Sequence, residues 1–184
     1  MQEFKKKRSR PGGPRRSLFA FARREDGSAA VEFGFIALPF FALLFATIEI
    51  ALHFFAGQIL ETGVQNASRL IRTGQAQEQG FSKEEFRKRV CETIYGILDC
   101  DNSILLDVRT YKDFSAAKNV KEAIKDGKVN VDEKFDPGDA GEIVVVRAFI
   151  EYPTIVPGLG QNLADLENGN SLLISTVAFR NEPF

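Results

Sequence analysis

The chain has few of the residues from which most enzyme and metal sites are built. Its 184 residues include one histidine, His53, and two cysteines, Cys91 and Cys100. A single histidine removes most metal-binding and general-base schemes, and the spacing of the cysteines does not fit a metal site. The sequence also has no phosphate-binding P-loop, no dinucleotide-binding glycine motif and no Ser/His/Asp set. We therefore expect no catalytic activity, no metal and no cofactor.

What the chain does have is one long apolar segment. Sixteen consecutive residues from Phe33 carry no charge, and the apolar character lasts to Phe55 if Glu49 and His53 are tolerated. A helix rises ~1.5 Å per residue and a hydrocarbon core is ~30 Å thick, so residues 33–55 are enough to span a membrane once. The segment is too long for the apolar core of a secretory signal, so we expect it to remain in the mature protein.

Charge is distributed unevenly on the two sides of this segment. Residues 1–27 hold nine Lys/Arg against three Asp/Glu, whereas residues 28–184 hold fifteen against twenty-two. Positive charge before a single span keeps the N-terminus in the cytoplasm, so the C-terminal part is expected to be exported. A basic leader can also bind nucleic acid. Its position directly before the span favours the topological role, and we expect no nucleic-acid partner.

Both cysteines lie in the part that is predicted to be exported. An even pair in an oxidising compartment indicates a disulfide between Cys91 and Cys100, with two separate buried thiols as the alternative. Closing so short a loop would stabilise the fold by about 2–3 kcal/mol.

The pattern after the span predicts an α+β fold. Apolar residues recur at helical spacing to about Thr73, and Gly74 supplies a stop. We expect a leader at 1–27, one long helix at 28–74 whose outer half offers an apolar stripe, and a small domain at 75–184 in which a helix packs on an antiparallel sheet of about three strands. The regular elements expected in that domain are a helix at 82–98 opened by a Ser-x-x-Glu capping box, strands at 104–111, 143–152 and 172–179, and a weaker helix at 116–125. A linker is expected at 75–80 and a turn at 136–139. The loop at 153–170 is expected to be partly ordered by Leu159, Leu163 and Leu166.

Inside the long helix, several residues predict contacts with other helices. Pro39 removes one backbone donor and should bend the helix. Small residues would let another helix approach closely, although such spacings also occur by chance. They are Ala30, Gly34 and Ala37, and further along Ala42 with Ala46. Glu49 and His53, four residues apart, share one helix face and are expected to pair at the outer headgroup boundary.

A single acidic residue, Glu32, stands at the start of the apolar segment. A carboxylate there costs free energy unless it is paired or kept near the headgroups, which makes it a functional candidate with an ordinary interfacial glutamate as the alternative. The sequence here resembles the prepilin peptidase site of type IV pilins and pseudopilins, because Gly27 is followed by the residues SAAVEF and then by the apolar run. The resemblance implies cleavage between Gly27 and Ser28, and an assembly role for Glu32 and Phe33. The new amine of Ser28, on this subunit or a neighbour, would then pair with Glu32 and fix the register of packed helices.

Other tracts resemble a narrower family. They are QNASR at 65–69, Tyr152-Pro153 with Pro157, and the ending AFRNEPF at 178–184. Together they look like TadE/TadG-like proteins of the Tad (tight adherence) pilus system. The family's major pilin is much shorter, so the resemblance implies a pseudopilin or minor pilin whose partners are a prepilin peptidase, other pilins, the inner-membrane assembly platform and membrane lipid. It also implies a single-pass anchor in a bacterial inner membrane with the C-terminal domain in the periplasm, or a place in the extracellular pilus. The alternatives are an uncleaved single-pass anchor that presents a binding or sensory domain, and a tethered envelope enzyme or chaperone.

Overall fold

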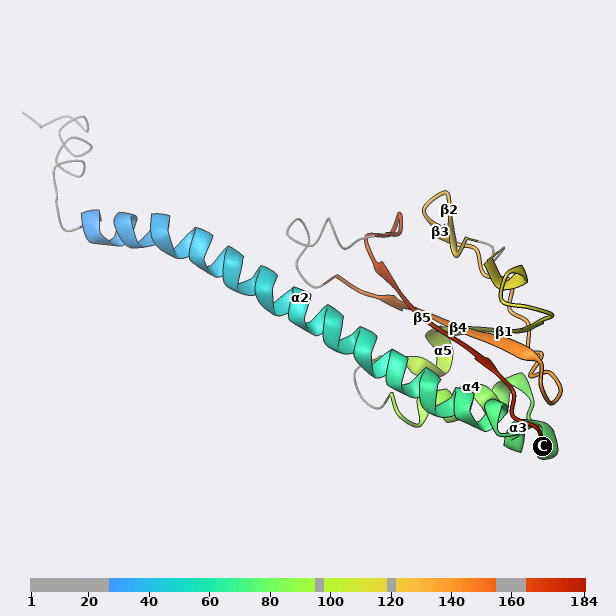
Figure 1. The fold of residues 1–184 in the computed structure, drawn as a ribbon. Coiled ribbons are helices and arrows are strands. Elements are labelled where there is room, and N and C mark those ends of the chain that lie inside the picture. Colours follow the sequence, from blue (N-terminus) through green and yellow to red (C-terminus); the bar gives the residue numbers. More distant parts are fainter. Residues whose placement is uncertain (1–26, 95–97, 119–121, 155–164) are drawn as a thin grey trace, which may run out of the picture. The chain divides into compact units, whose positions relative to one another are not determined.

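A computed structural model of the chain describes residues 27–94, 98–118, 122–154 and 165–184 (Figure 1). The chain divides into two compact units, Met1–Ala42 and Leu43–Phe184. The predicted α+β class is confirmed, because a long apolar helix is followed by a shorter helix and a three-stranded antiparallel sheet.

The long helix, α2, runs from Ser28 to Arg72 and continues through Pro39. It ends where the sequence predicted, because Gly74 adopts a left-handed conformation with φ 79°. The ring of Phe184 packs so closely against Gly74 that an added Cβ would overlap it. The predicted linker at 75–80 is partly wrong, since its first four residues form a one-turn helix, α3 (Gln75–Glu78).

The next helix, α4 (Lys83–Cys91), begins with the predicted capping box. The Ser82 backbone N–H donates to Glu85 Oε2 at 2.8 Å, and the Glu85 N–H donates to Ser82 Oγ at 3.2 Å. The hydrogen bond from the Ser82 backbone N–H lowers the pKa of the Glu85 carboxyl, and the Ser82 side chain lowers it further. The helix was expected to reach residue 98 but ends at Cys91, because Thr93 and Ile94 bond to carbonyls only three residues back and their branched side chains disfavour further helix.

A short helix, α5 (Cys100–Ser103), leads into the sheet. The sheet has the order β1-β4-β5, and both pairs of neighbours are antiparallel, with Val146 of β4 facing Val108 of β1 and Val177 of β5. The strands are β1 (Ile104–Tyr111), β4 (Ile143–Tyr152) and β5 (Ser171–Arg180), so two match the predicted bounds and the third is one residue longer at each end.

The helix predicted at 116–125 is wrong. The structure has one 3-10 turn at Ala116–Lys118 and then a small hairpin of β2 (Ile124–Lys125) and β3 (Lys128–Val129). The cause is the Asp-Gly pair between these strands, because both residues adopt positive φ (52° at Asp126, 66° at Gly127), as a two-residue hairpin turn requires.

Two further expectations concern loops. The turn expected at 136–139 lies further along, where the Glu142 N–H donates to the Asp139 carbonyl at 3.2 Å. Asp136 is engaged elsewhere, because its carboxylate accepts a hydrogen bond from the Thr110 hydroxyl at 2.7 Å. In the loop at 153–170, Leu166 is buried, while Leu159 and Leu163 lie outside the described residues.

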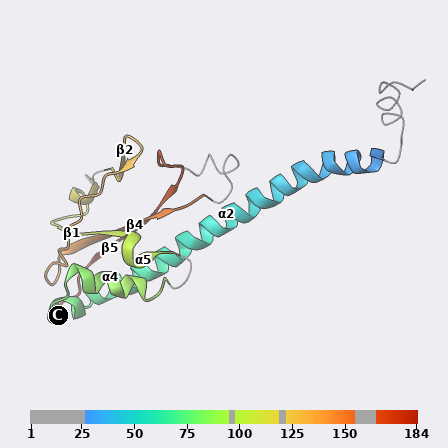
Figure 2. The same ribbon diagram turned by 180° about the vertical axis from the view of Figure 1, so that it is seen from behind.

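The core lies between one face of the sheet and two helices (Figures 1 and 2). The outer half of α2 contributes the apolar stripe that the sequence predicted. Its members, each at most 1% exposed, are Ala56, Leu60, Val64, Ala67 and Ile71. Gly63 lies against α4, where an added Cβ would stand 2.8 Å from the Val90 carbonyl oxygen. Glycine at this position therefore sets how closely α2 and α4 can pack.

Candidate functional site

The predicted processing residues lie in the first turns of α2. Gly27 and Ser28 are exposed, and Glu32 follows four residues after Ser28 on the same helix face. The Ser28 hydroxyl donates a hydrogen bond to Glu32 Oε1 at 2.9 Å. A free α-amine on Ser28 would offer the same carboxylate a charged partner.

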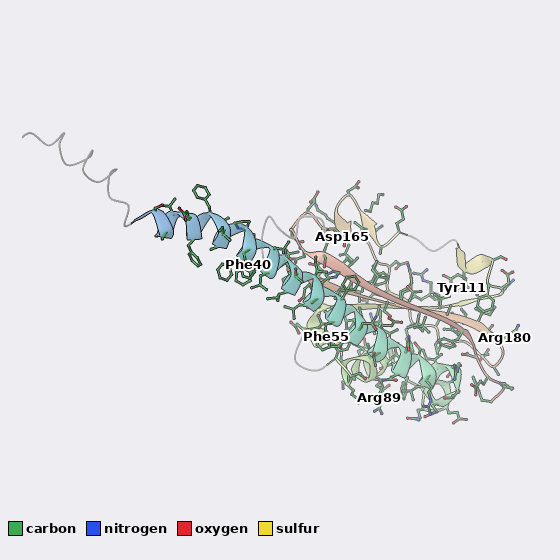
Figure 3. The ribbon with its side chains drawn as sticks, turned by 60° about the vertical axis from the view of Figure 1, so that its left-hand side comes forward. Phe40, Phe55, Arg89, Tyr111, Asp165 and Arg180 are labelled. Atoms are coloured by element: carbon green, nitrogen blue, oxygen red, sulfur yellow. A yellow bond between two sulfur atoms is a disulfide. The ribbon has the colours of Figure 1, made fainter. Side chains whose placement is uncertain are left out.

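The surface around Glu32 is strongly apolar. The large apolar side chains between Val31 and Phe41 are between 46% and 79% exposed, with Phe33 at 69%. Figure 3 shows such side chains standing out from the helix near Phe40. Large exposed apolar patches mark contacts with protein or lipid. By its length and composition α2 is the one membrane-span candidate in the described part of the chain.

The small residues predicted to line a helix contact also lie in this part of α2. Ala30 and Gly34 are exposed, and Ala37 is partly exposed. A Cβ added to Gly34 would meet no atom within 4 Å. The space beside Gly34 is therefore available to another helix.

A second group of polar residues gathers where α2 meets the end of the sheet. Glu49, Tyr152 and Ser171 are buried, at 3%, 7% and 0% exposure. His53 Nε2 lies 2.9 Å from Ser171 Oγ, and the His53 and Tyr152 rings meet edge to face with centroids 5.7 Å apart. Burial raises the pKa of Tyr152, and the nearby Glu49 carboxylate raises it further. The group attaches α2 to the last residue of β4 and the first residue of β5.

The sequence predicted only half of this group. It placed Glu49 and His53 on one helix face at the headgroup boundary, whereas the structure buries Glu49 within the Leu43–Phe184 unit and gives His53 a partner on β5. Tyr152 and Ser171 were not predicted as members, because no local pattern indicates which strand ends meet α2.

The two cysteines form a disulfide, as the sequence suggested. Cys91 at the end of α4 and Cys100 at the start of α5 have Cα atoms 5.6 Å apart. The bridge fixes the segment that enters β1 next to α4. Nearby, Glu133 makes a second link, since its carboxylate accepts hydrogen bonds from Lys83 Nζ at 3.1 Å and from the Leu106 N–H at 2.9 Å.

The acidic residues of the sheet are engaged in structural contacts. Asp107 is 1% exposed and forms ion pairs with Arg109, at 2.7 Å, and with Arg147. Burial alone would raise the pKa of Glu133. The hydrogen bonds that its carboxylate accepts from Leu106 and Lys83, together with the positive charges of Lys83 and Arg87, outweigh burial, so the pKa is lowered. In the part of the chain that the structure describes, no three His, Cys, Asp or Glu side chains are placed to hold a metal ion.

The terminal tract that resembled the Tad proteins connects the sheet to the end of α2. The Asn181 side-chain amide donates to the Pro137 and Asp139 carbonyls, each at 3.0 Å. The Glu182 N–H donates to the Arg72 carbonyl at 2.8 Å. The tract therefore has a structural role at the end of α2.

Comparison with known proteins adds one finding. No curated protein and no solved structure matches the chain. A family model described as TadE-like protein matches residues 27–69. The matched segment begins at the predicted cleavage residue, includes Glu32 and ends at Arg69, and it leaves out the sheet. Over residues 27–69, this chain is similar to the TadE-like protein family.

Proposed function

We propose that the chain is a pseudopilin or minor pilin of a Tad-type adhesion pilus. In this proposal a prepilin peptidase cuts between Gly27 and Ser28, and Glu32 then registers the helix against those of other subunits. The observation that carries the proposal is the TadE-like match over residues 27–69, within which Ser28 and Glu32 are hydrogen-bonded at 2.9 Å.

The proposed topology places residues 1–27 in the cytoplasm and residues 75–184 in the periplasm. A single span at about 33–55 crosses the inner membrane, and its outer end, from Glu49, lies at the headgroup boundary where the domain packs on it. Three observations support it. The basic residues precede the span, α2 is apolar and long enough to cross a bilayer, and the Cys91–Cys100 disulfide suits an oxidising compartment.

The proposed partners follow from the exposed part of α2. Its apolar side chains would contact lipid before assembly and the helices of other pilins or the assembly platform afterwards. The small residues Ala30, Gly34 and Ala37, with Phe33 beside them, would form the contact. The proposed function requires no catalytic group in residues 75–184.

The test is intact-mass spectrometry with N-terminal sequencing of the protein from native membranes. A chain that starts at Ser28, with or without an N-methyl group, is the expected result. A chain that still starts at Met1, in cells with an active prepilin peptidase, would overturn the cleavage and favour an uncleaved single-pass anchor that presents its domain for binding or sensing.

A further inference from the structure

β5 is an edge strand whose outer side can be identified. Just beyond β5, Asn181 lies opposite Glu142 in the register of β4 and β5. The Asn181 N–H donates to the Glu142 carbonyl at 2.9 Å, and the Asn181 carbonyl accepts from the Gly141 N–H at 3.2 Å. Residues along an antiparallel strand turn alternately toward and away from the neighbour. The odd-numbered residues of β5 therefore bond to β4, and the even-numbered residues turn their N–H and carbonyl groups to the open edge.

Both ends of this open edge are already occupied. The Leu172 N–H donates to Asp165 Oδ2 at 3.3 Å, and the Glu182 N–H donates to the Arg72 carbonyl at 2.8 Å. Between these ends, no described residue bonds the outward N–H groups, which belong to Ile174, Thr176, Ala178 and Arg180.

The middle of the edge lacks the usual protection against strand pairing. Proteins block open edges with lysine, proline or bulges. From Ser171 to Phe179 the strand has no charged residue and no proline, and its register with β4 is unbroken. Ile174, at mid-edge, is 51% exposed.

Space for incoming side chains exists on both sides of the edge. Toward α2 there is a groove of about 460 Å³, lined by Gly57, Gln58 and Glu61 of α2 and by Ser175 and Thr176 of β5, among others. On the other face a hollow of about 390 Å³ borders Ile174, Thr176 and Ala178. An added strand projects its side chains alternately to the two faces, so both spaces would be used.

One residue that lines the groove, Ser175, has a buried polar atom. The Ser175 hydroxyl belongs to a residue that is 5% exposed, and no described residue bonds it. A buried hydroxyl without a partner costs free energy, but this atom is enclosed and does not itself face a ligand. The open backbone N–H and carbonyl groups of the edge indicate a polypeptide ligand.

We propose that the open edge of β5 binds an extended segment of a second, different protein by strand addition. The expected segment is uncharged over about four residues, to match the uncharged edge, and carries a lysine or arginine beside the groove. Glu61 supplies the charge complementarity, since it is the charged residue of the α2 wall and Gln58 and Gln65 donate hydrogen bonds to its carboxylate at 3.1 and 2.9 Å. The inference rests on the proposed function only for placing this edge outside the membrane.

The direction of β5 argues against antiparallel pairing with β5 of a second copy of this chain. β5 begins beside His53 and ends beside Arg72, so it runs in the same direction as the outer half of α2. Two copies anchored in one membrane have parallel α2 helices, and antiparallel pairing of their β5 strands would require one anchor to be inverted. The other edge strand, β1, is covered at Val108, whose N–H donates to the Lys134 carbonyl at 2.7 Å.

The test places a photo-crosslinking amino acid at position 174 of the full chain, in cells that assemble the pilus. We expect one adduct with another envelope protein, mapped by mass spectrometry to a short uncharged stretch with a nearby basic residue. Thr176→Pro removes an outward N–H without touching the β4 ladder, and should lower the adduct yield about tenfold. Thr176→Ala keeps the N–H and should retain the yield. A crosslinker at Phe114, which is 57% exposed and distant in sequence, controls for non-specific capture.

Several outcomes would overturn the inference: an adduct with a second copy, an adduct with lipid alone, no adduct, or an undiminished adduct in Thr176→Pro. Thermal unfolding of each variant checks that the domain is folded. If Thr176→Pro does not fold, Thr176→Lys takes its place. This variant retains the N–H but charges the edge, so it should lose the adduct. Processing is scored on the same membranes. A processed and incorporated chain without the adduct refutes strand addition alone, whereas an adduct on an unprocessed chain refutes the pilin proposal alone.

Discussion

One helix supplies two different surfaces. In residues 28–42 of α2, the large apolar side chains are all about half exposed or more, whereas in residues 56–71 an apolar stripe is almost completely buried. Both stretches are rich in apolar residues. In the first they occur on all sides of the helix, whereas in the second they form one stripe and Gln, Asn and Arg occupy positions between them in the sequence. The all-round pattern suits lipid or a helix bundle and the stripe suits one packed side. The periodicity of the apolar residues, more than their number, indicates what covers each half.

The largest effect is expected from Glu32 in the first half. Glu32→Ala should permit cleavage but abolish incorporation into pili, because the charged partner of the Ser28 amine is lost. Glu32→Gln keeps an acceptor for the Ser28 hydroxyl and removes only the charge, so it separates the two contributions. Immunoblotting of sheared pili and of membranes measures both steps. Normal incorporation of Glu32→Ala would contradict the registration role.

Two leucines test the comparison directly. Leu60 is fully buried and Leu38 is 76% exposed on the same helix. Leu60→Ala should lower the free energy of unfolding of the folded unit by about 2–5 kcal/mol, because it leaves a cavity. Leu38→Ala should leave that free energy unchanged. Denaturant unfolding of the full chain in detergent micelles measures both, and equal losses would mean that the two halves share one core.

Two glycines give a smaller effect of the same kind. Gly63→Ala should cost about 1–3 kcal/mol, because the new methyl group meets the Val90 carbonyl and the helices must move apart. Gly34→Ala meets nothing within the chain and should leave unfolding unchanged. If the small residues of the first half pack against other subunits, Gly34→Ala will reduce incorporation instead. The same unfolding and incorporation assays apply.

The smallest effect concerns acid and the folded unit alone. The pKa of Glu133 is lower in the folded state than in the unfolded state. Its contribution to stability is therefore present above the unfolded pKa and is lost as pH falls through the folded pKa. Unfolding measured from pH 7 down to pH 3 should show this loss, and Glu133→Gln should show less of it while keeping an acceptor for the Leu106 N–H. Identical pH profiles would mean that Glu133 stays protonated or is unpaired.

Local signals predicted much of this structure. Gly74, the Ser82 capping box and the three β-rich runs each carry their own stop or start, and Ser28 and Glu32 meet because four residues make about one helical turn. The failures have physical causes as well. The Asp126-Gly127 turn overrode a weak helical pattern, and the group around Glu49 joins residues 118 positions apart in the chain, His53 and Ser171. Such contacts depend on how the sheet docks on α2, which no local pattern encodes.

The parallel course of β5 and the outer half of α2 has a mechanical consequence. The two elements are joined near His53 and Ser171 at one end and near Arg72 and Glu182 at the other. A pulling force along α2 would act on both junctions and on the core between them in shear, so they must yield together. Perpendicular loading would open them one at a time and at lower force. A subunit drawn along its own helix axis would therefore resist extraction better than one pulled sideways.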